Sequence, residues 1–136
     1  MSKLYISGEN PLNGSTKIDG AKNSILPILA ATLLCDGVSV IHNCPALSDV
    51  AVSFKILEHL GCRCTYRDNT AVIDATAVSK SEIPDSLMRE MRSSIVFMGA
   101  ILGRAGECTV SVPGGCELGP RPIDMHIAAL RKMGIE

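Results

Sequence analysis

Aromatic side chains are scarce: tryptophan is absent, and two tyrosines and two phenylalanines make up 3% of the 136 residues. A surface that binds single-stranded nucleic acid by stacking needs more aromatic rings. The formal net charge of −1 also excludes a strongly basic nucleic-acid module. The longest apolar runs, 25–34 and 95–102, are too short to span a bilayer, and the first residues lack a signal-peptide pattern. We therefore expect a cytoplasmic protein with neither nucleic acid nor membrane as a partner.

The composition is that of a folded domain, with 46% hydrophobic and 20% charged residues. Six cysteines are too few for a disulfide-stabilised secreted scaffold, so we expect reduced thiols, most of them buried. Cys62 and Cys64 alternate along a predicted strand and are expected to pack on one face. No CxxC pair, zinc-like histidine spacing, P-loop or GxGxxG motif is present. Neither a metal nor a cofactor is therefore expected.

Local patterns predict a mixed α/β order of elements. Strands are predicted over 3–7, 15–18, 38–42, 62–66, 70–74 and 108–112. Helices are predicted over 21–34, 48–60, 84–102 and 122–133. Ser48 is expected to be the N-cap of the second helix and Gly61 its C-cap. Pro27 is expected in about the first turn of its helix, or to kink that helix. Pro122 is expected at the first position of the last helix.

The chain repeats a pattern of helix end, glycine turn, strand, loop and helix. Residues 33–40 match 101–110, and each following helix has an early aspartate, Asp49 in the first copy and Asp124 in the second. The second copy is about five residues longer between strand and helix, in a loop over 113–120, and such insertions tend to mark a working face. The second copy stops two residues into its next expected strand, so we expect a piece of a longer protein.

A few residues could carry chemistry. Glycines leave Cys116 accessible in the inserted loop, and Arg121 beside a helix start would favour its thiolate form; the alternative is a flexible turn with an exposed cysteine. Lys22 at a helix start would form an anion site with free N–H groups, or be a solvated lysine. Arg92 and His126 are further candidates. The alternative for Arg92 is a residue at the rim of a helix, and the alternative for His126 is an ordinary surface or core residue.

Four ordered blocks of sequence carry a family resemblance: GAKN at 20–23 with LP at 26–27, PALSDV at 45–50, MRSS at 91–94, and PGGC at 113–116 with RPID at 121–124. Together they resemble the UDP-N-acetylglucosamine 1-carboxyvinyltransferase family over essentially the whole chain. The resemblance implies an enolpyruvyl transferase fold built from βαβαββ repeats, of which about one and a half are present. It also implies that residues 1–20 contribute strands to another domain. Residues 21–136 would form an incomplete first domain, whose partner is a missing C-terminal domain of the same protein.

The resemblance further implies an activity: transfer of the enolpyruvyl group from phosphoenolpyruvate to the 3-hydroxyl of UDP-N-acetylglucosamine with release of phosphate, the first committed step of peptidoglycan synthesis. Cys116 matches the family's general acid, the thiol that fosfomycin alkylates, and a general acid must start protonated. Lys22, Arg92 and Arg121 match positions that bind phosphoenolpyruvate. Six residues match positions that contact the nucleotide sugar in the family: Asn23, Arg92, Arg121, Pro122, Asp124 and His126.

Three alternatives stay open. The related 3-phosphoshikimate 1-carboxyvinyltransferases share the fold and phosphoenolpyruvate, although the Cys116 loop and the Lys22-Asn23 pair favour the nucleotide-sugar enzyme. The chain could instead be a non-catalytic fragment or binding module, because half of a two-domain site cannot close around its substrates. We expect no turnover from the chain alone. A thiol redox module built on Cys62 and Cys64 is the third alternative.

Overall fold

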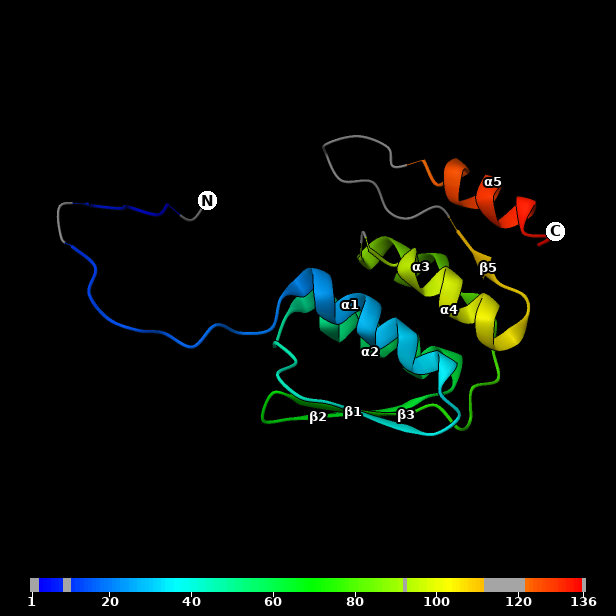
Figure 1. Ribbon diagram of the computed structural model, residues 1–136, viewed down its shortest axis with the longest axis horizontal. Coiled ribbons are helices and arrows are strands. Elements are labelled where there is room, and N and C mark those ends of the chain that lie inside the picture. Colours follow the sequence, from blue (N-terminus) through cyan, green and yellow to red (C-terminus); the bar gives the residue numbers. More distant parts are fainter. Residues whose placement is uncertain (1–2, 9–10, 92, 112–121, 136) are drawn as a thin grey trace.

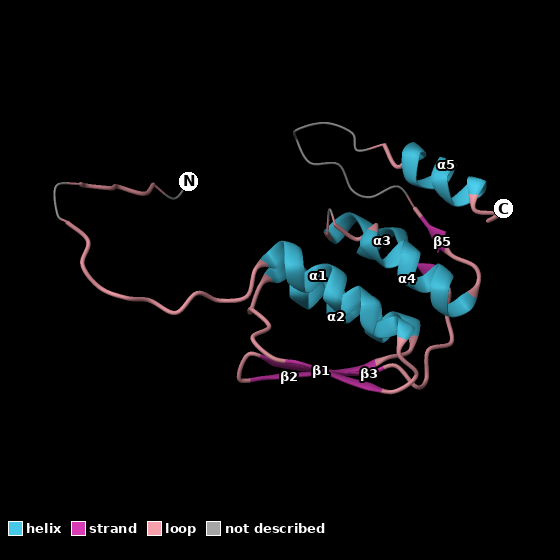
Figure 2. Cartoon of the chain, in the orientation of Figure 1, coloured by secondary structure: helices cyan, strands magenta, loops and turns pink. Residues whose placement is uncertain are grey.

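A computed structural model describes residues 3–8, 11–91, 93–111 and 122–135. Helices and two small sheets form a mixed α/β structure, as expected, in which α1 and α2 cover one face of the larger sheet (Figures 1 and 2). The elements in chain order are α1 (Lys22–Ala31), the 3-10 turn η1 (Thr32–Leu34), β1 (Val38–Ile41), α2 (Ser48–Leu60), β2 (Arg63–Arg67), β3 (Thr70–Asp74), β4 (Glu82–Ile83), α3 (Asp85–Glu90), α4 (Val96–Ala105), β5 (Thr109–Val110) and α5 (Asp124–Lys132). None of these helices is both long enough and apolar enough to cross a membrane.

The larger sheet has the order β1-β3-β2, with both pairs antiparallel. The strands predicted over 62–66 and 70–74 form a hairpin: β2 and β3 are joined at Asp68 and Asn69, whose φ angles of 48° and 55° are positive. A two-residue hairpin turn needs positive φ values, which aspartate and asparagine tolerate better than most residues. The smaller sheet pairs β4 with β5 in parallel, and α3 and α4 form the crossover between them.

The core lies between the helices and the larger sheet. Residues of α1, α2 and α4 pack there on the inward side chains of β3, which are Ala71 and Ile73. The largest side chains that are fully buried include Leu26, Leu29, Ile56, Leu57 and Phe97. Gly61 ends α2 in the left-handed conformation, with φ 110°, which confirms the predicted cap. This packing fixes the relative positions of α1 and α2, and therefore of the residues at their starts.

The prediction of one long helix over 84–102 is wrong. The helix α3 ends at Met91, whose φ and ψ of −134° and 123° are extended, and α4 starts at Val96. The buried Ser94 hydroxyl donates a hydrogen bond to the Met88 carbonyl oxygen at 3.1 Å. Serine side chains compete in this way with the main-chain bonds of a continuous helix. The polar residues before the apolar run therefore mark a break between two helices.

The predicted strands over 3–7 and 15–18 are also wrong. Residues 3–8 and 11–20 have no regular secondary structure, and they lead away from the body of the protein before α1 (Figure 1). Leu4, Tyr5 and Ile6 are exposed there. Alternating apolar residues form a strand only when a neighbouring strand satisfies their main-chain groups, and none of the described strands pairs with these ranges.

Several predicted helix and strand limits are displaced. Leu47, not Ser48, is the N-cap of α2, and α5 starts at Asp124, so Pro122 precedes the helix. Pro27 lies in the second turn of α1, where its missing N–H leaves the carbonyl oxygen of Asn23 without a helical donor. The last strand is shorter than predicted, since β5 covers only Thr109–Val110.

Candidate functional site

Four helices point their N-terminal ends to the same side of the molecule. The helices α1, α2, α4 and α5 all run from left to right in Figure 1. Helix starts carry free N–H groups and the positive end of the helix dipole. Neither α1 nor α4 has an acidic residue in its first turn or a side-chain cap, so nothing within these two helices neutralises that potential. This side of the molecule is therefore suited to anions.

Gly20 lets α1 start close to the loop that leads into α2. A Cβ atom on Gly20 would overlap the carbonyl oxygen of Asn43 and lie 3.1 Å from Cδ of Pro45. Both neighbours belong to the main chain or to a proline ring, so they cannot rotate away. The glycine of the GAKN block is thus required by a close approach between two segments. That approach sets Lys22, the first residue of α1, beside the start of α2.

The Lys22 ammonium forms an ion pair with Asp49 across the two helix starts. Its Nζ lies 2.5 Å from Oδ2 of Asp49. The Lys22 side chain is 51% exposed and that of Asp49 only 19%, so the carboxylate is held against the protein while the ammonium reaches the surface. The prediction that Lys22 lies at a helix start is confirmed. The spacing of Asp49 predicted only an acidic first turn, and its contact with Lys22 arises from helix packing.

Ser53 connects Asp49 to the break between α3 and α4. The Ser53 hydroxyl donates to the carbonyl oxygen of Asp49 at 2.9 Å, and it lies 3.7 Å from Sδ of Met91. Ser53 and Met91 are both buried. The chain just before Arg92 is therefore anchored one helical turn from Asp49. Arg92 itself lies outside the described residues.

The inserted loop is outside the described residues too. Residues 112–121, which include Cys116 and Arg121, are not among the described residues. The roles expected for these two residues therefore stay predictions. Pro122, the first described residue after the loop, is exposed. The structure therefore tests neither the predicted proton donor nor two of the three predicted cations.

The start of α5 lies across from the start of α4. His126 lines a cavity of about 360 Å³ together with Ile95 and Val96. Asp124 is exposed in the first turn of α5, and Asn23 is exposed in the first turn of α1. No ion pair between described residues involves Asp124 or His126. The residues that could contact a ligand thus come from different helix starts and remain accessible.

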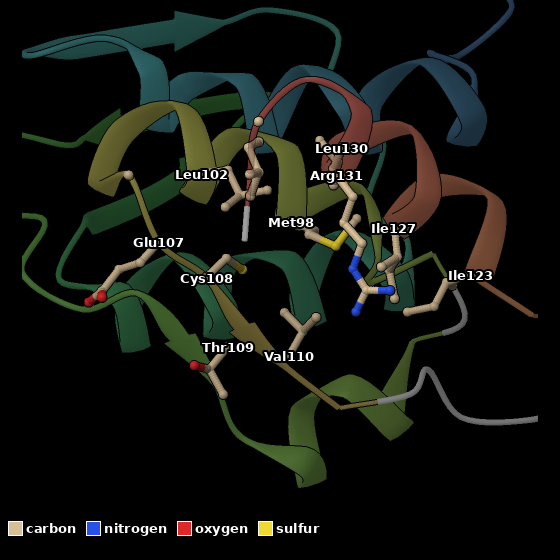
Figure 3. A pocket seen from close by; sticks show the side chains of 13 residues that line it. Met98, Leu102, Glu107, Cys108, Thr109, Val110, Ile123, Ile127, Leu130 and Arg131 are labelled. Carbon is tan, nitrogen blue, oxygen red and sulfur yellow. The ribbon is translucent and has the colours of Figure 1, made fainter.

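A larger groove of about 720 Å³ lies along α4, β5 and α5. Side chains of Met98, Leu102, Ile127 and Leu130 surround it, with Cys108 at its edge (Figure 3). Its charged lining residues are limited to one arginine and one glutamate, Arg131 and Glu107. A multiply charged anion needs several fixed cations, so this groove is not the candidate anion site.

The thiols of Cys62 and Cys64 are shielded from water. Burial raises the pKa of Cys62 to about 11 and that of Cys64 to about 12, so both stay protonated at neutral pH, which argues against a redox centre built on them. All five described cysteines are free, but fewer are buried than predicted: Cys44 and Cys62 are buried, Cys64 and Cys108 are half-buried and Cys35 is exposed. Among the described residues, no group of three or more histidine, cysteine or acidic side chains could hold a metal ion.

Comparisons with known proteins point to one family. The sequence profile described as "EPSP synthase (3-phosphoshikimate 1-carboxyvinyltransferase)" matches residues 6–136. The chain is 54% identical over 136 residues to "UDP-N-acetylglucosamine 1-carboxyvinyltransferase 2" of Caldanaerobacter subterraneus subsp. tengcongensis, covering all of this chain and 33% of that protein. It is 44% identical over 137 residues to "UDP-N-acetylglucosamine 1-carboxyvinyltransferase" of Chlorobium limicola, covering all of this chain and 32% of that protein. The chain thus spans about a third of the length of the curated relatives it matches.

A solved structure agrees with the sequence comparisons. The crystal structure of the enolpyruvyl transferase NikO from Streptomyces tendae matches with a TM-score of 0.63 and 29% sequence identity. The match covers 73% of this chain and 23% of that one. The arrangement of helices and small sheets is therefore shared with a known enolpyruvyl transferase.

Proposed function

The chain belongs to the EPSP synthase (3-phosphoshikimate 1-carboxyvinyltransferase) family, and we propose on that basis that it forms part of an enzyme that transfers the enolpyruvyl group of phosphoenolpyruvate to the 3-hydroxyl of UDP-N-acetylglucosamine and releases phosphate. The observation that carries the choice of acceptor is the 54% identity to a relative named for UDP-N-acetylglucosamine. The reaction would begin peptidoglycan synthesis. In this proposal the activity belongs to the whole protein, and we expect no turnover from the 136-residue chain alone, because half of a two-domain site cannot close around its substrates.

Phosphoenolpyruvate carries a carboxylate and a phosphate, so its site needs fixed positive charges. Lys22 supplies one of them at the start of α1, beside the free N–H groups of that helix. Arg92 and Arg121 supply the others. Charge-assisted bonds from these groups orient the substrate and stabilise the charge that develops on it. The N-termini of α1, α2, α4 and α5 point to the same side of the molecule as Lys22 (Figure 1), which supports placing the anionic substrate there.

The chemistry needs a proton donor and an oriented acceptor. The methylene carbon of phosphoenolpyruvate gains a proton and becomes a methyl group, while the acceptor hydroxyl loses its proton and its oxygen bonds to the neighbouring carbon. The tetrahedral intermediate then loses a proton from that methyl group and expels phosphate, which restores the double bond. Cys116 is the proton donor, and it must therefore start as the neutral thiol. Contacts to the nucleotide sugar come from the two helix starts, through Asn23, Pro122, Asp124 and His126.

Residues 1–20 belong to a second domain in this proposal, and 21–136 to the first, loop-bearing domain. The exposed Leu4, Tyr5 and Ile6 support this division, because apolar residues in a strand pattern are normally covered. The substrates lie between the two domains, where closure excludes water. The remainder of the second domain lies outside the chain.

A chimera tests the proposed function. The 136 residues replace the matching segment of the Caldanaerobacter relative, and phosphate release is measured with phosphoenolpyruvate and each of two acceptors. We expect release with UDP-N-acetylglucosamine, and less from the Lys22→Gln variant. Release only with shikimate 3-phosphate would favour the alternative that the family profile's description suggests. Phosphate release by the unfused chain would contradict the proposed inactivity of the chain alone.

The role of Cys116 has its own test in the same chimera. We expect Cys116→Asp to keep activity, because a carboxylic acid can still deliver a proton, and to escape alkylation by the epoxide fosfomycin. Cys35→Ser is the matched control, since it removes an exposed thiol elsewhere in the chain. Alkylation is followed by mass spectrometry. If Cys116→Asp is alkylated as fast as the parent, the assignment of Cys116 is wrong.

A further inference from the structure

Five ion pairs join described residues, and the pair of Lys22 with Asp49 differs from the others in its carboxylate. The Asp49 side chain is 19% exposed, whereas the carboxylate side chains of the other four pairs are 40% to 89% exposed. Exposed pairs contribute little to stability, because water screens them and two long side chains must be immobilised. The Lys22–Asp49 pair is therefore the one in which a largely buried carboxylate binds a cation that is more exposed than itself.

Asp49 is fixed by contacts on both carboxylate oxygens and on its carbonyl oxygen. Its Oδ2 binds Lys22, and Oδ1 lies 3.4 Å from the Ser48 hydroxyl. Its carbonyl oxygen accepts the hydrogen bond from Ser53. Asp49 is also in the first turn of α2, where the helix dipole favours a negative charge. The carboxylate is thus rigidly attached to the core, whereas Lys22 would otherwise be a mobile four-carbon side chain.

We propose that Asp49 is a positioning residue that holds the Lys22 ammonium in place for an anionic substrate. The inference rests on the proposed function, in which Lys22 binds phosphoenolpyruvate. An ammonium has three donors; with one bonded to Asp49, the others are free for a substrate oxygen, and the lysine is already ordered before binding. Ordering the side chain in advance reduces the entropy cost of binding and of reaching the transition state.

Positioning is distinguishable from two simpler roles of Asp49. If the aspartate only lowered the local positive charge, its removal would tighten anion binding and leave kcat unchanged. If it only stabilised the fold, its removal would lower Tm while the folded fraction kept its KM and kcat. A positioning role instead lowers kcat more than it raises KM, since an error of about 1 Å in placing a group can cost about 100-fold in rate.

The first experiment uses the chain itself, with inorganic phosphate as the probe. The Lys22 ¹⁵Nζ signal reports by NMR whether the ammonium is held. We expect a resolved signal in the parent that shifts on addition of phosphate, loss of that signal in Asp49→Asn, and its recovery in Asp49→Glu, whose longer side chain still reaches Nζ. Asp36→Asn is the matched control, because it breaks the 3.0 Å pair with Arg104 without contacting Lys22. An unchanged Lys22 signal in Asp49→Asn would overturn the proposal.

The second experiment measures phosphate release by the chimera. For Asp49→Asn we expect kcat to fall about 10- to 100-fold and KM for phosphoenolpyruvate to change less than about 3-fold. Asp49→Glu should recover most of kcat, and Asp36→Asn should match the parent. Unchanged kcat in the folded Asp49→Asn protein, with or without a lower KM, would overturn the positioning role. An inactive parent chimera would refute the proposed function instead, and the NMR comparison would still decide whether Asp49 holds Lys22.

Discussion

A single methyl group added at Gly20 should disturb the candidate site from outside it. In Gly20→Ala, the new Cβ overlaps the Asn43 carbonyl oxygen and crowds Cδ of Pro45 at 3.1 Å. Because both atoms belong to rigid groups, the start of α1 must move away from the loop before α2. That movement changes the distance between Lys22 and Asp49, which is 2.5 Å in the parent.

The size of the effect follows from the overlap. Restoring an ordinary contact with the Asn43 carbonyl oxygen requires a shift of about 1–1.5 Å. Overpacking of this kind costs about 1–3 kcal/mol of unfolding free energy, which corresponds to a fall in Tm of about 3–15 °C for a domain of this size. A displacement of up to 1 Å at a substrate-binding cation costs up to about 100-fold in kcat. The variant should therefore lose more activity than its loss of stability explains.

Thermal unfolding of the chain, followed by circular dichroism, and phosphate release by the chimera measure the two effects. Gly37→Ala is the control, because a Cβ there has no neighbour within 4 Å among the described residues; it should leave both readouts near the parent values. If Gly20→Ala keeps the parent's Tm and its Lys22 NMR signal, the close approach does not position Lys22 and the reasoning is refuted.

Three further predictions concern stability and thiol chemistry. Gly61→Ala should lower the unfolding free energy measured in urea by about 1–3 kcal/mol, because φ is +110° there and a Cβ would overlap a neighbouring carbonyl; an unchanged midpoint would contradict this. In a Cys116→Ser background at about pH 8, only Cys35 among the described cysteines should react rapidly with Ellman's reagent, because burial raises the pKa of the other four; a second fast thiol would be inconsistent. Hydrogen bonds from Thr76 hold the pKa of Asp74 below its ordinary value, so they stabilise the fold above the ordinary aspartate pKa, and this stabilisation is lost as pH falls through the lowered value. Thr76→Val should raise the pKa of Asp74 in an NMR titration and lower Tm at neutral pH but not in acid; equal Tm differences at both pH values would argue against this.

Features that depend on nearby residues were predictable from the sequence. The C-terminal end of α2 with its cap at Gly61, and the strands on either side of Asp68 and Asn69, follow from propensities that act over a few residues. The helical position of Lys22 is of the same kind. These predictions succeed because one turn of helix or one tight turn fixes its own dihedral angles.

Features that depend on distant partners were not predictable. Alternation in residues 3–7 is typical of a strand, but a strand needs a neighbour that the described chain does not supply. The long predicted helix is interrupted at Met91, whose sulfur lies 3.7 Å from the Ser53 hydroxyl of α2, a partner 38 residues away. The contact of Asp49 with Lys22 was not predictable for a related reason: the position of Asp49 indicates only a helix start, and the contact arises from the packing of α1 on α2.

The larger sheet is held by more contacts than the smaller one. The candidate site therefore has a rigid part, at the starts of α1 and α2, and a more mobile part, at the start of α5. The parallel pairing of β4 with β5 has two register pairs, and α5 has no buried side chain. Lys22 and Asp49 instead belong to α1 and α2, which pack on each other, and α2 packs on β2 of the three-stranded sheet. Amide hydrogens of α5 should therefore exchange through local openings of lower free energy than those of β3. A ligand that contacts both Lys22 and His126 would order α5 as it binds. Ordering α5 costs conformational entropy, so it reduces the net free energy of binding. Binding is therefore selective for ligands long enough to reach both residues.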